Sequence, residues 1–296
     1  MNSWLLATRP KTLTAALVPI LVGSALAALA RPEGLDWTIS LLALASAMFI
    51  QIGTNLVNDA IDFKKGADNE HRIGPRRVTA SGLLTPRQVM TGAVICLTVA
   101  LLLGIPLVIE GGWPIVAVGL VSLFFAYGYT GGPFPLAYLG LGDLFVLIFF
   151  GWVAVGGVYF LQTGTFDPDS WVAGTQVGLL ATVLIAVNNL RDREGDVRVG
   201  KRTLAVRIGV RGSRLEIALL CAVPFLLGAY WLTRGLFAVA LIPLFAAPIA
   251  GVLVRQIYRT EPGPEYNQFL AQAAKVHLAF GVLWAIGAAV QMKLMR

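Results

Sequence analysis

Two short stretches of this chain carry residue types that could bind a divalent cation together with an anionic substrate. They are NLVNDAIDFKKGAD at 55–68 and NNLRDREGD at 188–196. On a helix, the asparagine and the two aspartates of each stretch would lie on one face, at spacings of i, i+4, i+7 and of i, i+4, i+8. The residues of these two faces are Asn55, Asp59 and Asp62, and Asn188, Asp192 and Asp196.

Four carboxylates that face one pocket repel each other and therefore need cations. Magnesium suits them, because it takes oxygen ligands and commonly bridges one or two carboxylates to substrate phosphates. Basic residues follow each stretch and suit the phosphate oxygens beyond the metal. They are Arg72, Arg76 and Arg77 after the first stretch, and Lys201 and Arg202 after the second. The pattern predicts a magnesium and diphosphate site.

The rest of the chain has the composition of an integral membrane protein. Of its 296 residues, 57% are hydrophobic and 13% are charged, and the mean hydropathy is +0.75. Soluble domains carry about 25% charged residues. The apolar runs are continuous rather than alternating, which favours helices over strands. The two cysteines, Cys96 and Cys221, lie within apolar runs and indicate neither a disulfide framework nor a zinc site.

Nine apolar runs are long enough to cross the hydrocarbon core as helices. They predict an all-α, polytopic bundle that forms a single domain over residues 1–296, with turns at Gly111-Gly112 and at YTGGPFP, residues 129–135. The runs are 12–31, 37–58, 88–109, 113–129, 138–161, 171–190, 215–233, 235–257 and 272–292.

The basic residues orient this bundle. With a cytoplasmic N-terminus, the inside segments hold or border 19 of the 23 Lys and Arg residues, as the positive-inside rule requires. An even number of crossings separates the acidic stretches, so both would face the cytoplasm from a bacterial plasma membrane. The same bias explains the net charge of +7 without a nucleic-acid partner. A diphosphate held at this surface would carry a lipid tail, so an isoprenoid diphosphate is the expected substrate.

The acidic stretches have a simpler alternative, in which they are ordinary charged helix ends. Lys64 and Lys65 follow the first pair of aspartates, and Arg191 and Arg193 flank Asp192. However, a carboxylate at membrane depth costs about 2.5–3.5 kcal/mol on insertion scales. Two such faces at one side of the membrane, each followed by a basic loop, favour a functional pair.

The two stretches resemble the aspartate-rich motifs of the UbiA superfamily of intramembrane prenyltransferases, in NDAIDFKKGAD and RDREGDVRVGKRTLAVRIG. Nine helices with both motifs on the cytoplasmic side match that family as well. ATRPKTL at 7–13, GPRRVTASGLLTP at 74–86 and YTGGPFPLAYLGLGDLFVLIFFG at 129–151, together with the second motif, are similar to the 1,4-dihydroxy-2-naphthoate prenyltransferases of menaquinone or phylloquinone synthesis.

The resemblance implies a reaction and assigns roles to the aspartates. A polyprenyl diphosphate would lose diphosphate with the help of magnesium. Its allylic carbon would alkylate the naphthoate ring, and the ring carboxylate would leave as carbon dioxide. Magnesium would be held by Asp59, Asp62, Asp192 and Asp196.

The chain departs from the family pattern at two places. Many members have a third acid four residues after the second, where this chain has Gly66. The nearest acid here is Asp68, which is a further candidate metal ligand. Many relatives also carry a basic pair in the loop after the fourth helix, where YTGGP has none. The substitutes we consider for diphosphate binding are Arg9, Lys11 and Lys201.

Further residues join the candidate site, each with a simpler alternative. Asn55, Asn58 and Asn188 would bind metal or donor, or form hydrogen bonds at helix ends. Arg76, Arg77, Lys201 and Arg202 would bind diphosphate, and Arg9 and Lys11 an anionic substrate, or all six only set the topology. Tyr127 and Tyr129 would stabilise an allylic cation with their ring faces, or belong to an interfacial aromatic belt. Asp143 would have a role in the pocket, His71 would be a base or a solvated loop residue, and His277 would pack or snorkel.

Two long connections, 63–86 and 193–212, are expected to form a cytoplasmic cap that excludes water from the cation.

Alternatives remain for the function. The same chemistry on another aromatic acceptor, such as 4-hydroxybenzoate or homogentisate, is one. A secondary transporter is another, although transporters place polar groups near the midplane. The length of the prenyl chain, and with it menaquinone or phylloquinone, stays open.

Overall fold

The computed structural model describes residues 2–31, 33–66, 73–75 and 77–295, without the side chain of Lys11. All regular structure in this part of the chain is helical, as predicted. Seven apolar segments are long enough to cross a membrane: Trp37–Lys64 (α3), Pro86–Gly111 (α4), Gly142–Thr163 (α7 Gly142–Val146, η2 Leu147–Val153, α8 Ala154–Thr163), Pro168–Arg198 (α9), Leu204–Thr233 (α10 Leu204–Leu226, α11 Gly228–Thr233), Phe237–Arg259 (α12 Phe237–Leu241, η3 Ile242–Ala246, α13 Ala247–Arg259) and Tyr266–Leu294 (α14).

Two shorter apolar helices, Thr14–Ala30 (α2) and Trp113–Gly128 (α5), complete the bundle in the described residues. Each of the nine predicted runs overlaps one of these nine segments. Most boundaries differ by a few residues, but α3 and α9 end 6 and 8 residues later than predicted, α14 begins 6 residues earlier, and α10 begins at Leu204 rather than at 215. Three short elements, Ser3–Ala7 (α1), Pro10–Thr12 (η1) and Leu136–Leu139 (α6), lie outside the long helices. The sequence thus predicted the helices correctly.

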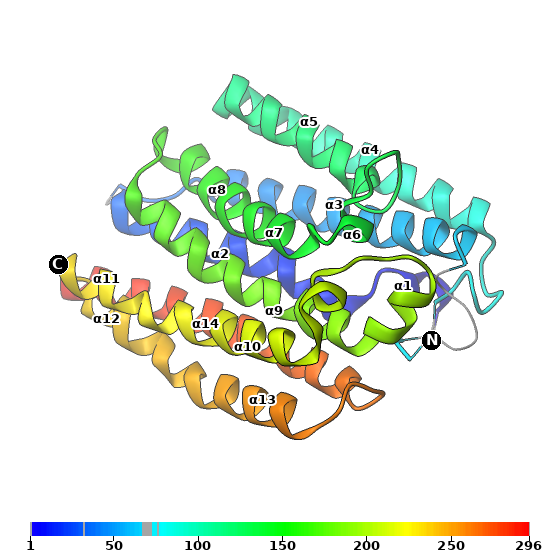
Figure 1. The fold of residues 1–296 in the computed structure, drawn as a ribbon. Coiled ribbons are helices and arrows are strands. Elements are labelled where there is room, and N and C mark those ends of the chain that lie inside the picture. Colours follow the sequence, from blue (N-terminus) through cyan, green and yellow to red (C-terminus); the bar gives the residue numbers. More distant parts are fainter. Residues whose placement is uncertain (1, 32, 67–72, 76, 296) are drawn as a thin grey trace.

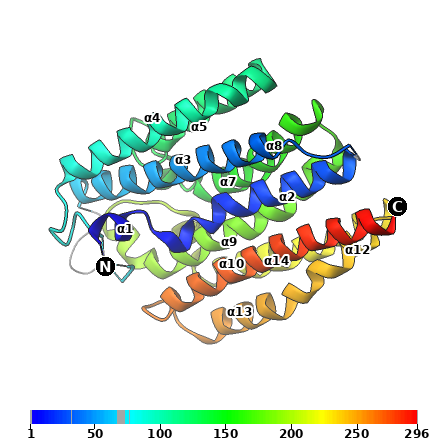
Figure 2. The ribbon, with the colours of Figure 1, turned by 180° about the vertical axis from the view of Figure 1, so that it is seen from behind.

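The long segments run roughly along one axis, and the two ends of the chain lie at opposite ends of the bundle (Figures 1 and 2). We call the basic end the one that holds the N-terminus and the C-terminal ends of α3 and α9 (Figure 1). Both acidic stretches therefore lie at one end, as the count of crossings predicted.

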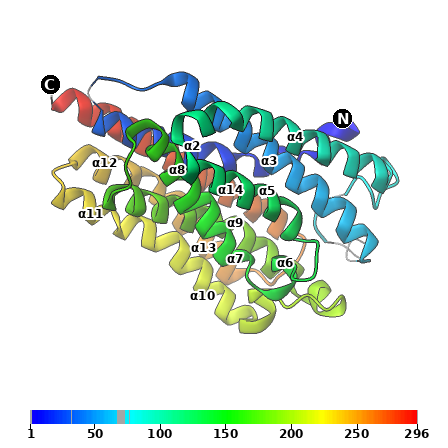
Figure 3. The ribbon, with the colours of Figure 1, turned by 90° about the horizontal axis from the view of Figure 1, so that it is seen from above.

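Helix α9 occupies the middle of the bundle. It contacts α2, α8 and η2 as well as α10 and α14 (Figures 1 and 3), and it is the most buried of the seven long segments. Its small residues allow this: a Cβ atom at Gly151 of η2 would lie 2.5 Å from the carbonyl oxygen of Gly174, and one at Gly178 would lie 2.6 Å from that of Leu147. Close backbone contact therefore fixes η2 against α9, as small residues do in membrane helix pairs.

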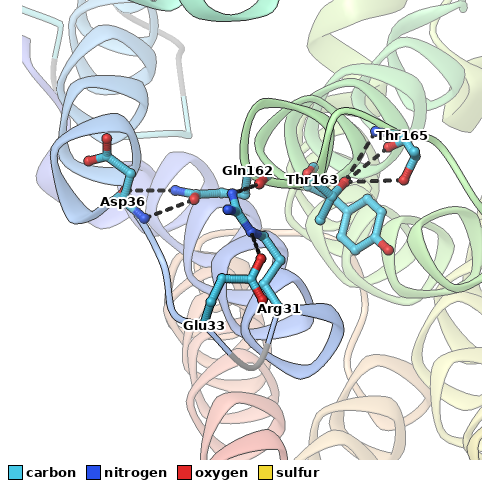
Figure 4. A network of polar contacts seen from close by, with 7 residues as sticks. Arg31, Glu33, Asp36, Gln162, Thr163 and Thr165 are labelled. Carbon is cyan, nitrogen blue, oxygen red and sulfur yellow. Dashed lines mark hydrogen bonds and ion pairs between the residues drawn. The ribbon is translucent and has the colours of Figure 1, made fainter.

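The opposite end of the bundle is held by side chains that bond to the backbone of a loop (Figure 4). The Gln162 amide donates to the carbonyl oxygen of Asp36 at 2.7 Å and accepts from its N–H at 3.1 Å. Arg31 donates to Glu33 at 2.7 Å and also to the carbonyl oxygen of Gln162. These bonds tie the α2–α3 loop to the end of α8, and so close the bundle at the end that lies away from the acidic residues.

The predicted connection 193–212 is mostly helical, which corrects the expectation of a long cap loop. Helix α9 continues to Arg198 and α10 begins at Leu204, so only residues 199–203 connect them. The helical path of α10 breaks at Gly209, whose φ of 70° favours glycine. In the other connection, Ile73, Pro75 and Arg77 line the cavity described below, and Val78 is buried. That part of the loop covers the basic end.

Candidate active site

A cavity of about 1120 Å³ runs along the inside of the bundle. Its lining on α3 extends from Ala43 to Asp62, a distance of about 28 Å at 1.5 Å per residue. Polar and charged groups line it at the basic end, and Leu107, Ile115 and Leu161 line it near the opposite end. The cavity can therefore take a long apolar chain with a charged head.

The aspartates of the first stretch lie on the buried face of α3. Asp59 is 1% exposed, and its Oδ1 accepts from the backbone N–H of Thr79 at 3.2 Å and also from the Thr79 hydroxyl. Asp62, one turn further on, accepts from the Tyr138 hydroxyl at 2.9 Å, and its Oδ1 lies 3.4 Å from the Lys201 ammonium. The chain thus holds both carboxylates in place from segments that are distant in sequence.

Asp192 of the second stretch forms a bidentate ion pair with Arg191. The guanidinium donates to the two carboxylate oxygens at 2.8 and 2.6 Å, and also to Asn188 at 2.6 Å and Asn267 of α14 at 2.8 Å. The Arg191 side chain is fully buried. Asn267 in turn donates to the carbonyl oxygen of Ile73 at 3.1 Å. This network links the second acidic stretch to α14 and to the loop after α3.

The four aspartates line the same cavity, as the sequence predicted for a shared pocket. Within the described ranges no three His, Cys, Asp or Glu side chains are close enough to hold one metal ion. Two of the aspartates come from α3 and two from α9.

The donor set fits magnesium. Carboxylate oxygens, together with the amide oxygens of Asn58 and Asn188 in the same cavity, are the hard ligands that this ion prefers. The asparagines also have bonds within the protein: Asn58 accepts from the Thr130 hydroxyl, and Asn55 donates to the carbonyl oxygen of Thr8 at 3.0 Å. Hydrogen bonding at the helix end and a place in the pocket thus coexist at these positions.

The predicted phosphate-binding residues separate into two groups. Arg9, Arg77 and Lys201 line the cavity, whereas Arg202 is exposed and does not. Arg202 instead serves the fold through its backbone, which donates to the carbonyl oxygen of Tyr138 at 3.0 Å. Four other predicted residues and one side chain are outside the part of the chain that the structure describes. They are Asp68, His71, Arg72 and Arg76, and the side chain of Lys11.

Lys65 belongs to the same charged end, although the sequence did not single it out. Its ammonium lies 4.2 Å from the centroid of the Tyr138 ring, and that of Lys201 lies 4.8 Å from it, within the range of cation–π contacts. Lys65 also donates to the carbonyl oxygen of Thr130 at 2.9 Å. Burial lowers the pKa of Lys65, and the negative charge of Asp62 partly opposes that shift. Two ammonium groups therefore flank the first acidic pair.

The two tyrosines at the end of α5 have different surroundings. Tyr129 lines the cavity, whereas Tyr127 is 50% exposed and lies outside it. Residues two positions apart on a helix point about 200° apart, so they cannot both face the cavity. The placement of Tyr127 favours the interfacial alternative for that residue, and a role beside an allylic cation stays a prediction for Tyr129 alone.

Several side chains at the site escaped the sequence analysis because only tertiary contacts reveal them. Thr79, Thr130 and Tyr138 hold the residues of the first stretch, and Asn267 accepts from the Arg191 side chain that pairs with Asp192. Each threonine or tyrosine lies at least 20 positions from the residue that it bonds. His277 is fully buried away from the lining of the cavity, in keeping with the packing alternative.

Comparison with known proteins places this arrangement in context. Residues 16–286 match the UbiA prenyltransferase family. A 1,4-dihydroxy-2-naphthoate octaprenyltransferase of Haemophilus influenzae is 34% identical over 97% of this chain and 96% of its own length. The protein of that name from Escherichia coli is 35% identical over 97% of this chain and 94% of its own length. The UbiA prenyltransferase domain-containing protein 1 of Gallus gallus is 31% identical over 96% of this chain and 84% of its own length.

Solved structures show the same fold. A UbiA homolog from Aeropyrum pernix superposes with a TM-score of 0.70 over 95% of this chain and 98% of that one, at 16% identity. A UbiA homolog from Archaeoglobus fulgidus, solved with GPP and Mg²⁺ bound, superposes with a TM-score of 0.61 over 98% and 99%, at 15% identity.

Proposed function

Because this chain belongs to the UbiA prenyltransferase family, we propose that it transfers a polyprenyl group from an isoprenoid diphosphate to 1,4-dihydroxy-2-naphthoate, with release of carbon dioxide and diphosphate. The observation that carries the proposal is the 34–35% identity, over 97% of the chain, to enzymes that bear this name. The product would be a demethylated quinol for quinone biosynthesis. Family membership argues against the secondary transporter.

The two ends of the cavity would bind different parts of the donor. Its apolar body, which reaches Ile115 and Leu161, would hold the prenyl chain in the same environment as the bilayer. At the basic end, Asp59, Asp62, Asp192 and Asp196 would hold magnesium against the diphosphate. Lys201 and Arg77, which line the same cavity, would contact the phosphate oxygens.

Catalysis would depend on charge and on the exclusion of water. Magnesium bound at these carboxylates would supply Lewis-acid stabilisation of the charge that develops on the departing diphosphate. Tyr129 lines the cavity and would turn its ring face to the allylic carbon. Residues 73–75, 77 and 78 lie between the contact of Ile73 with Asn267 and that of Thr79 with Asp59, and they would keep water from that carbon.

The purified protein should transfer a labelled octaprenyl group to 1,4-dihydroxy-2-naphthoate in detergent, where no ion gradient exists. We expect turnover to stop when EDTA removes magnesium and to return when magnesium is added back. Parallel reactions with 4-hydroxybenzoate and homogentisate test the acceptor. A higher kcat/KM for either of them would overturn the assignment to the naphthoate, and turnover that survives EDTA would overturn the metal site.

We also propose that the nine apolar segments cross the bilayer of a bacterial plasma membrane, with the basic end in the cytoplasm. Support comes from the excess of Lys and Arg at that end. In a variant without Cys96 and Cys221, a cysteine at Thr165, in the loop after α8, should react with an impermeant maleimide added to intact cells. One at Glu261, at the basic end, should react only after lysis. The reverse pattern would refute this orientation.

A further inference from the structure

Asp143 is a buried acid that belongs to neither aspartate-rich stretch. It lies at the start of α7, lines the cavity, and is 6% exposed. Its Oδ2 is 3.5 Å from the amide nitrogen of Asn189, at the limit of a hydrogen bond. Its Oδ1 is buried and has no hydrogen-bond partner among the residues that the structure describes. A buried carboxylate oxygen without a partner is costly, so it points to a ligand group.

The surroundings of Asp143 suit a flat aromatic molecule. Tyr129, Phe145 and Phe149 line the same cavity. The centroid of the Tyr129 ring lies 5.4 Å from that of Phe145, and Phe145 stacks on Phe149 at 4.1 Å with 22° between the ring planes. Aromatic rings pair favourably with other rings, so this part of the cavity suits a flat aromatic ligand.

Asp143 is also close to the charged end where the diphosphate would bind. A Cβ atom at Gly142, the residue before Asp143, would lie 2.9 Å from the Tyr129 hydroxyl oxygen, and Tyr129 lines the same cavity as Asp62 and Asp196. The Tyr129 hydroxyl therefore lies beside the segment that carries Asp143, in the cavity that also holds the acidic stretches. A molecule bound against Asp143 would meet the allylic carbon of a donor whose diphosphate is held at those stretches.

The backbone around Asp143 is held against α9. The Thr182 hydroxyl of α9 lies 3.4 Å from the carbonyl oxygen of Asp143 and donates to that of Gly178 at 2.8 Å. The same part of α9 is in close backbone contact with Gly151. Fixed groups of this kind favour catalysis because little reorganisation is needed.

We propose that Asp143 is the catalytic base for the aromatic acceptor: its carboxylate binds the ring hydroxyl next to the reacting carbon and takes the proton of that hydroxyl. The inference rests on the proposed function. Loss of the proton raises electron density on the adjacent ring carbon, which is the carbon that must attack the allylic centre.

The step balances with the groups already named. The ring carbon forms a bond to the allylic carbon. The bond between the allylic carbon and the diphosphate oxygen breaks, and the electron pair of that bond leaves with diphosphate. The hydroxyl proton moves to Asp143 and leaves a ring ketone. When the ring carboxylate departs as carbon dioxide, its bonding pair restores the aromatic ring, and the proton returns from Asp143 to the oxygen.

The Asp143→Asn variant tests this role, because asparagine has the same shape and cannot take the proton. We expect kcat for 1,4-dihydroxy-2-naphthoate to fall by about 10²–10⁴-fold, with little change in the KM of the donor. The 1-methoxy analogue of the acceptor provides a readout apart from turnover. Wild-type protein should bind the dihydroxy compound about 10-fold or more tightly than this analogue, and the variant should bind the two within about 3-fold.

Two controls separate this role from a structural one. Glu110→Gln makes the same chemical change at an exposed position near the opposite end and should leave both readouts unchanged. Hydrolysis of the donor without acceptor should survive in Asp143→Asn, because on this proposal the aspartate-rich stretches, and not Asp143, hold magnesium and the diphosphate. Loss of that hydrolysis in the variant, or a kcat within about 3-fold of wild type, would overturn the proposal.

The outcomes also distinguish the inference from the proposed function. No turnover of the naphthoate by wild-type protein would refute the function, whereas normal turnover by both proteins would refute only the role of Asp143. If Asp143→Asn does not fold, as judged by size-exclusion chromatography in detergent, the affinities of the wild-type protein for the two acceptor compounds test the inference. Equal affinity for the dihydroxy compound and its 1-methoxy analogue would then overturn the inference.

Discussion

Asp59→Asn is expected to lower kcat for prenyl transfer by at least about 10²–10³-fold, the scale seen when one preorganised electrostatic contact to a transition state is lost. Asparagine keeps the shape of the side chain, and its carbonyl oxygen can still accept from Thr79 as Asp59 does. The negative charge that attracts magnesium is lost. Folding of Asp59→Asn should therefore persist while turnover falls. Asp192→Asn should lower kcat on the same scale and should also unfold at a lower temperature, because it leaves the buried Arg191 guanidinium without its charged partner.

The measurement is single-turnover transfer of a labelled prenyl group in detergent, together with thermal unfolding of the same sample. Asp169→Asn is the matched control, because Asp169 lies at the other end of α9 and pairs with the exposed side chain of Arg234 at 3.1 Å. It should keep its activity. Wild-type rates in Asp59→Asn or in Asp192→Asn would show that the stretch concerned does not bind the catalytic metal.

Gly157→Leu is expected to change which donors the enzyme accepts. Gly157 lines the cavity on α8, and a Cβ atom at this position would meet nothing within 4 Å. A leucine side chain therefore has room to extend into the space that a long prenyl chain would occupy. Overpacking of this kind costs about 1–3 kcal/mol, so kcat/KM for an octaprenyl donor should fall by roughly 5- to 150-fold.

A geranyl donor should be little affected, because Gly157 lies 14 positions beyond Asp143 along the same segment, about 21 Å at 1.5 Å per residue. The control is Gly251→Leu on α13, where a Cβ atom also meets nothing within 4 Å and the residue lies outside the cavity. It should process both donors as wild type does. A parallel loss of both donors in Gly157→Leu would mean that the chain does not pass this glycine.

The sequence by itself determined the helices and the two acidic faces. Long apolar runs can satisfy their backbone hydrogen bonds in a bilayer only as helices, so composition and length were enough to predict nine segments. The i, i+4 spacing in Asn55–Asp62 and Asn188–Asp196 is a local property of a helix, and it placed each set on one side of α3 or α9. The bias of Lys and Arg then put both sets at the same end, where the structure has them.

Only the tertiary structure decided which side chains meet there. Tyr138 reaches Asp62, Thr79 reaches Asp59 and Asn267 reaches Arg191 across helices that are far apart in the chain. The tertiary structure also showed that Tyr129 faces the cavity whereas Tyr127 does not. One carboxylate oxygen of Asp143 has no hydrogen-bond partner among the described residues. Such facts depend on helix rotation and on close contacts between helices, which the packing of small residues such as Gly151 sets. Hydrophobic periodicity is weak in helices that are apolar on every side, so the sequence does not encode that rotation locally.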